Sequence, residues 1–115
     1  MSVAIYKPEK ITKEFLTEAF AKARKAALDA DPGDDKDGGS CNMDTPRLKL
    51  PMVRWRLIQE SAAAAGVTLG TKIKGRFFIF VGTNGQAHQR TVMAEAACQS
   101  LVESGLDASM WYHLD

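Results

Sequence analysis

The hydrophobic positions of the chain follow a helical period in three stretches. Over 12–30, apolar side chains recur every three or four positions, with Phe15 and Ala19 on one stripe. Similar spacing recurs over 52–65 and over 86–104. The sequence therefore predicts three amphipathic helices. In the third, six side chains are expected to face inward: Met93, Ala94, Ala97, Cys98, Leu101 and Val102.

Between these helices, a two-residue period predicts short strands. Over 46–50, leucines alternate with basic residues, and Pro51 stands where the next helix can begin. Residues 67–81 are expected to form a hairpin that turns at Gly75. Its second arm, 76–81, is apolar throughout, which predicts a central strand buried on both faces.

A last strand is predicted over 108–114, with Met110, Tyr112 and Leu114 on one side. The resulting order is helix, strand, helix, two strands, helix, strand. That order indicates an α+β fold: a mostly antiparallel sheet of about four strands packed with three helices. We expect a single domain over 1–115, in which 31–40 forms a partly flexible acidic loop.

Composition and charge argue against two classes of protein, nucleic-acid binders and membrane-spanning proteins. The chain has 115 residues, is 45% hydrophobic and has a net charge of +1. It lacks the overall basic excess typical of a dedicated nucleic-acid binder, so a nucleic-acid partner is not expected. The basic cluster of Lys72, Lys74 and Arg76 is interpreted as the solvated face of the hairpin. No apolar run reaches the roughly 18 residues needed to span a bilayer, and the N-terminus lacks a signal-peptide pattern. We therefore expect a cytoplasmic protein with reduced thiols and no membrane partner.

The segment 37–44, with the sequence DGGSCNMD, gathers carboxylates, a thiol, an amide, a hydroxyl and two glycines. Adjacent glycines let backbone N–H groups approach a ligand closely, and the polar side chains supply donors and acceptors. No helix or strand of a core needs this mixture. The segment supplies seven candidate ligand-binding residues: Asp37, Gly38, Gly39, Ser40, Cys41, Asn42 and Asp44.

This motif resembles a pattern found in small uncharacterised bacterial and phage proteins, in which DGG is followed by Ser or Thr, CN, an apolar residue and Asp. The similarity extends over 37–115, through the basic aromatic hairpin and the glycine-rich turn that precedes the last helix. It implies a shared site. It implies no particular activity or ligand.

A second polar segment, 82–90, joins the apolar strand to the third helix. A helix N-terminus carries unpaired N–H groups and a partial charge of about +0.5, which suits an anion. The alternative is that Thr83 or Asn84 only caps the helix. The segment adds six candidate ligand-binding residues: Thr83, Asn84, Gly85, Gln86, His88 and Arg90.

If the two segments converge, they form a cleft with aspartates on one side and phosphate donors on the other. We therefore expect non-enzymatic binding of a small nucleotide-like or other anionic, phosphate-bearing metabolite. In a phage, such a protein could sequester a signalling nucleotide of the host defence. A site this small often forms between subunits, so a homo-oligomer is an open alternative. No metal or cofactor is predicted, because the acidic spacing does not match a calcium loop.

Two other functions stay open. Cys41 could act as a nucleophile with His88 or His113, although the neighbouring aspartates disfavour a thiolate. The chain could instead inhibit a protein partner without any pocket, using the basic hairpin and Trp111 as its surface. The residues thus favour a binder over an enzyme.

Overall fold

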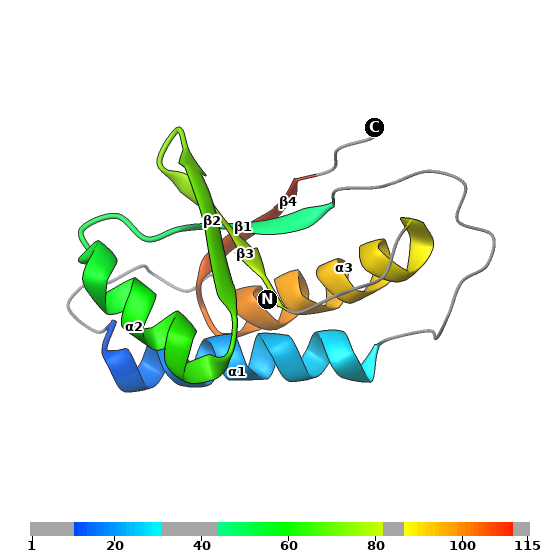
Figure 1. Ribbon diagram of the computed structural model, residues 1–115, viewed down its shortest axis with the longest axis horizontal. Helices are drawn as coiled ribbons and strands as arrows, with labels where there is room; N and C mark the ends of the chain where they lie inside the picture. The colour runs from blue at the N-terminus through cyan, green and yellow to red at the C-terminus, as the bar shows by residue number, and fades with distance from the viewer. Residues whose placement is uncertain (1–10, 31–43, 82–86, 112–115) are drawn as a thin grey trace.

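Four strands form one antiparallel sheet, and three helices pack on one face of it (Figure 1). The computed structural model describes residues 11–30, 44–81 and 87–111. This arrangement confirms the predicted α+β fold. In chain order the elements are α1 (Lys13–Asp29), β1 (Thr45–Lys49), α2 (Trp55–Ala65), β2 (Thr68–Ile73), β3 (Arg76–Phe80), α3 (Ala87–Glu103) and β4 (Asp107–Trp111).

The strands lie in the order β2-β3-β1-β4, and every neighbouring pair is antiparallel. Apart from α1, the chain follows a β-α-β-β-α-β path, the split β-α-β arrangement. Each of α2 and α3 links two strands that have a third strand between them. This path places β3 and β1 at the centre of the sheet, so the predicted central position of the apolar strand is confirmed. The arrangement by itself implies no function.

The core lies between the sheet and the helices. Leu48 of β1 and Phe77 and Ile79 of β3 are buried on the helix side. Helix α1 packs against both α2 and α3 and contributes Leu16 and Phe20, whose side chains are completely buried. Alternate strand positions are thus used for the core, while the intervening side chains point to the opposite side of the sheet.

A two-residue turn connects β2 and β3. Lys74 and Gly75 have φ angles of 53° and 80°. Positive φ at both positions is the geometry of a type I′ turn, whose twist matches that of the flanking strands. The hairpin predicted around Gly75 is therefore confirmed, and its basic tip projects away from the helices (Figure 1).

Three details of the sequence interpretation are wrong. The strand over 76–81 is buried on one face only, because all three helices lie on that side, and Phe80 keeps 37% of its surface exposed. Helix α2 begins at Trp55 rather than at 52, because Pro51 and Met52 form a turn in which Met52 has a φ of 67°. Val102 is exposed, since it lies on the outer side of α3.

None of the helices in the described part of the chain is both long and apolar enough to cross a bilayer.

The burial of α1 can be tested with two leucines of the same helix. Leu16→Ala should lower the free energy of unfolding by about 2–5 kcal/mol, because it leaves a cavity in a closely packed core. Leu28→Ala should change it by about 0.5 kcal/mol or less, since Leu28 is 46% exposed. Urea unfolding monitored by circular dichroism measures both. Equal effects would show that α1 does not pack as described.

Candidate functional site

Asp44 and Arg90, which end the two predicted polar segments, are hydrogen-bonded to each other. Asp44 lies immediately before β1 and is buried, and Arg90 and Thr91 lie near the start of α3. Arg90 Nε donates to the backbone oxygen of Asp44 at 3.2 Å, and Arg90 Nη2 donates to Thr45 Oγ1 at 3.1 Å. Thr91 Oγ1 donates to Asp44 Oδ2 at 2.6 Å. These four residues, which we term the Asp44–Arg90 joint, fasten α3 to the beginning of β1.

The joint shows where the two segments meet the fold. Segment 37–44 ends at the joint, and segment 82–90 ends there too. The convergence of the segments themselves stays a prediction, as does the role of His88, of which only the backbone is described. Ten predicted site residues lie outside the described part of the chain: Asp37, Gly38, Gly39, Ser40, Cys41, Asn42, Thr83, Asn84, Gly85 and Gln86.

Both predicted site residues in the joint have partners within the protein. Arg90 directs Nε and Nη2 to acceptors before and within β1, and the Asp44 carboxylate accepts from Thr91. Hydrogen bonds to charged groups typically contribute about 1.5–3 kcal/mol, so these contacts can account for the positions of both side chains. The joint therefore supports the fold by holding the start of α3 against the start of β1.

A second candidate lies on the side of the sheet away from the helices, which we term the open face. The strand register places Phe78 beside Arg47, and Arg47 in turn beside Ser109. No described helix packs on this side. The open face includes eight side chains from three strands: Arg47 and Lys49 of β1; Arg76, Phe78 and Phe80 of β3; and Asp107, Ser109 and Trp111 of β4.

Three of these side chains form a cluster in which Arg47 and Phe78 each contact Trp111. The guanidinium carbon of Arg47 lies 5.0 Å from the centre of the Trp111 ring, within the range of a cation–π interaction. Trp111 also meets Phe78 edge to face, with 5.8 Å between the ring centres. Arg47 Nη2 donates to Ser109 Oγ at 3.5 Å, which steadies the guanidinium across β1 and β4. Trp111 keeps 38% of its surface exposed, so the cluster presents an aromatic ring to solvent.

The cluster leaves one donor of Arg47 unsatisfied. Arg47 Nε is buried, and among the described residues it has no hydrogen-bond partner. Burying a charged donor without an acceptor costs about 1–3 kcal/mol or more. Most buried polar groups have a partner, so an exception of this kind calls for an explanation, and a functional role is one of the recognised explanations.

The opposite end of the open face is charged. Arg76 Nη1 lies 3.4 Å from Asp107 Oδ1, and the exposed Lys49 lies between these residues in the strand register. The open face is therefore polarised along its strands. Its aromatic end adjoins the joint, because Trp111 pairs with Thr45 at the start of β1.

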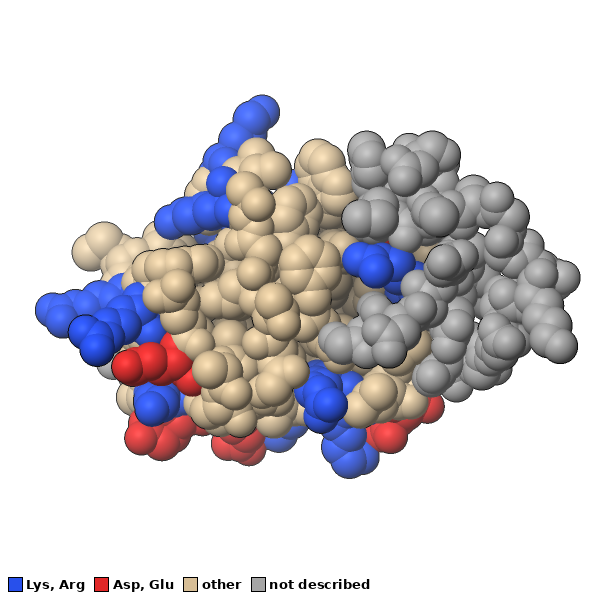
Figure 2. Space-filling model, viewed as in Figure 1, with Lys and Arg blue, Asp and Glu red and all other residues tan. Residues whose placement is uncertain are grey.

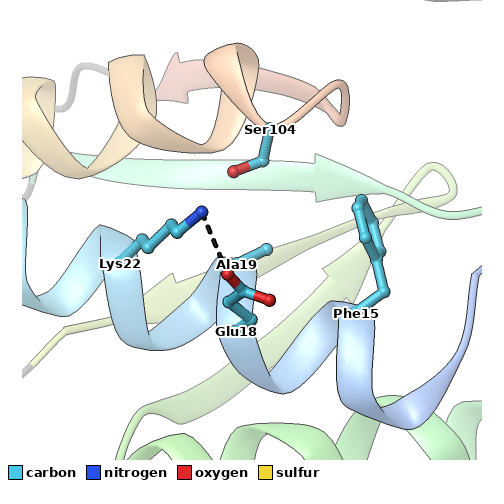
Figure 3. A pocket seen from close by; sticks show the side chains of 5 residues that line it. All are labelled: Phe15, Glu18, Ala19, Lys22 and Ser104. Atoms are coloured by element: carbon cyan, nitrogen blue, oxygen red, sulfur yellow. Dashed lines mark ion pairs between the residues drawn. The ribbon is translucent and has the colours of Figure 1, made fainter.

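Other features of the described chain give weaker support for a functional site. A hollow of about 190 Å³ lies between α1 and Ser104 (Figure 3), but the Glu18 and Lys22 side chains that line it form an exposed ion pair across 3.1 Å. No group of three His, Cys, Asp or Glu side chains within the described ranges could hold a metal ion. Cys98 is buried in α3, and burial, together with the nearby Glu95 carboxylate, raises the pKa of its thiol.

Comparison of the chain with protein-family models, with curated proteins and with solved structures found no match. The resemblance carried by segment 37–44 therefore stays a prediction.

The sequence interpretation missed most of the open face, although a signal for it was present. A strand over 76–81 that is buried on both faces, as its sequence predicts, would place Phe78 and Phe80 in the core. The alternation of Arg47 and Lys49 with buried leucines already indicated one polar side of β1. Pairing that polar side with the alternate aromatic residues of β3 would have placed arginine beside phenylalanine.

Removing the hydroxyl of Thr91 tests the joint. Thr91→Val should lower the free energy of unfolding by about 1–3 kcal/mol, because it leaves the buried Asp44 carboxylate without this donor. Thr17→Val is the matched control, since Thr17 is also a half-buried helical threonine. Urea unfolding measures both variants. A Thr91→Val variant as stable as Thr17→Val would mean that the joint does not hold α3.

Thiol labelling tests the burial of Cys98 and isolates Cys41. Near neutral pH, the raised pKa keeps Cys98 in its unreactive thiol form, and burial blocks access. Iodoacetamide should therefore modify the native protein only at Cys41, if at all, and both cysteines after unfolding. Peptide mass spectrometry identifies the modified site. Labelling of native Cys98 would contradict the packing of α3, and an unreactive Cys41 would exclude it as a nucleophile.

Proposed function

We propose that this protein binds a nucleotide-like, phosphate-bearing ligand without transforming it. The observation that carries the proposal is the cluster of Arg47, Phe78 and Trp111 on the open face. It combines an exposed aromatic ring with a guanidinium in contact with that ring. Such a pair suits a ligand that has both a flat aromatic group and a negative charge.

Stacking of a nucleobase on Trp111 would account for recognition of the aromatic part of the ligand. Every nucleobase has a π-face, and stacking on an aromatic side chain is worth about 1–3 kcal/mol per base. Trp111 offers a partly exposed ring, and its contact with Phe78 fixes the ring against β3. A ring held in this way loses little conformational freedom when a base stacks on it.

The phosphate part rests on the cations beside the ring. Arg47 lies against Trp111, and Lys49 follows on the same side of β1. Guanidinium and ammonium groups form charge-assisted hydrogen bonds with phosphate oxygens. Asp44 and Arg90, which are the described ends of the polar segments 37–44 and 82–90, lie in the joint next to the aromatic end of the face. We therefore propose that the candidate residues of both segments also contact the ligand.

A binder rather than an enzyme is proposed because the open face holds no nucleophile with an adjacent base. The eight side chains named on it are aromatic or basic, apart from Ser109 and the ion-paired Asp107. A protein of this kind acts by holding its ligand, which is consistent with a sequestering role. The alternative enzyme depends on Cys41, which lies outside the described residues.

Thermal unfolding with a panel of nucleoside mono-, di- and triphosphates tests the proposal. A ligand at 100 times its Kd should add about 2.7 kcal/mol, or roughly 10 °C in Tm for a domain of this size. Trp111→Ala should abolish the shift, whereas Trp55→Ala should retain it. Trp55 is the matched control, because it is 37% exposed and contacts Phe77 on the helix side.

The same experiment distinguishes the open alternatives. Chromatography after incubation should recover the ligand unchanged, and a chemically altered ligand would favour the enzyme. The absence of a Tm shift with every nucleotide at millimolar concentration would contradict the proposal. A shift that persists in Trp111→Ala would move the site away from the open face.

A further inference from the structure

Charge is distributed unequally between the two layers of the fold. The three helices carry six basic and six acidic side chains, so the helical layer is balanced. The four strands carry four basic side chains and a single acidic one, Asp107. Lys74 adds another cation in the turn between β2 and β3. The whole-chain charge of +1 therefore conceals a basic sheet layer.

The basic side chains continue well past the aromatic cluster. From Phe80 to Arg76 the open face extends four residues along β3, or about 13 Å at 3.3 Å per residue. Lys74 extends the charge to the tip of the hairpin, where Figure 2 shows basic atoms at the top of the view, whereas Lys72 pairs with Phe77 and lies on the other side of the sheet. One phosphate next to a base stacked on Trp111 cannot contact cations spread over this length.

The ligand that matches this pattern has bases at one end and several phosphates along its length. We infer that the open face binds a single-stranded nucleic acid of a few nucleotides, an inference that rests on the proposed function and names its ligand class. Bases stack on Trp111 and Phe80 at the aromatic end. The backbone continues past Lys49 towards Arg76 and the hairpin tip.

Single strands fit this surface better than duplexes. A duplex hides the faces of its bases and offers only their edges, whereas a single strand can lay unstacked bases on aromatic side chains. Trp111 and Phe80 keep 38% and 37% of their surfaces exposed. Gly70 keeps room for the second ring, because a Cβ at that position would lie 2.6 Å from the Phe80 ring.

Fluorescence anisotropy with labelled oligouridylates and oligothymidylates of two, four and twelve nucleotides tests the inference, with uridine monophosphate as competitor. At least one tetramer should bind roughly 10-fold or more tightly than the mononucleotide, because it places further bases and phosphates on the face. Contact with about three phosphates predicts a salt slope near −2, or about 20-fold weaker binding from 50 to 200 mM salt. A duplex of twelve base pairs should bind more weakly than the single strand.

Matched pairs of variants test which side chains contact the oligonucleotide. Trp111→Ala should weaken tetramer binding by about 5- to 150-fold, the range expected for one lost stacked base, while Trp55→Ala should not. Lys49→Glu, at an exposed position outside the core, should weaken binding and lower the salt slope, while Lys13→Glu on α1 should do neither. Circular dichroism checks that each variant is folded.

The outcomes separate the inference from the proposed function. If the mononucleotide binds as tightly as the tetramer, the inference fails and the proposed function stands. If the duplex binds as tightly as the single strand, the binding is electrostatic only and the inference fails. If neither mononucleotide nor oligomer binds, both fail.

Discussion

One-sided packing of the sheet is the constraint on which the rest of the structure depends. Helix α1 adds a third element to the two helices of the split β-α-β path, and it packs against both of them. The three helices therefore cover the core on their side of the sheet, where Leu16, Phe20 and Phe77 are buried. The alternate side chains of the strands, including Phe78 and Trp111, are left without a described helix to cover them.

Because no described helix covers the open face, contacts among its own side chains hold it together. Trp111, on an edge strand, covers the Arg47 guanidinium and meets Phe78 of a central strand. The contacts link three strands, yet they bury Arg47 Nε with no partner among the described residues. A face selected for stability alone would replace this arginine with an apolar residue, since burying an unpaired donor costs free energy. We propose that the cluster serves recognition of an anionic ligand.

Periodicity was enough to predict the fold class, the hairpin turn and the central position of β3, because each depends on local spacing or chain order. It was not enough to predict the open face. Phe77 and Phe78 are adjacent and chemically identical, and only the position of the helices decides which of them is buried. The Asp44–Arg90 contact escaped prediction as a structural joint for a similar reason, because it connects residues far apart in the sequence.

The most direct measurement is a two-dimensional NMR titration that follows the two tryptophan indole N–H resonances while a uridine tetranucleotide is added. These groups report on opposite sides of the sheet, since Trp111 lies on the open face and Trp55 contacts Phe77 on the core side. We predict that the Trp111 resonance shifts in a saturable manner, together with the backbone amides of β1 and β3, while the Trp55 resonance stays in place. Shifts confined to Trp55 and the helices would contradict the assignment of the open face as the binding surface.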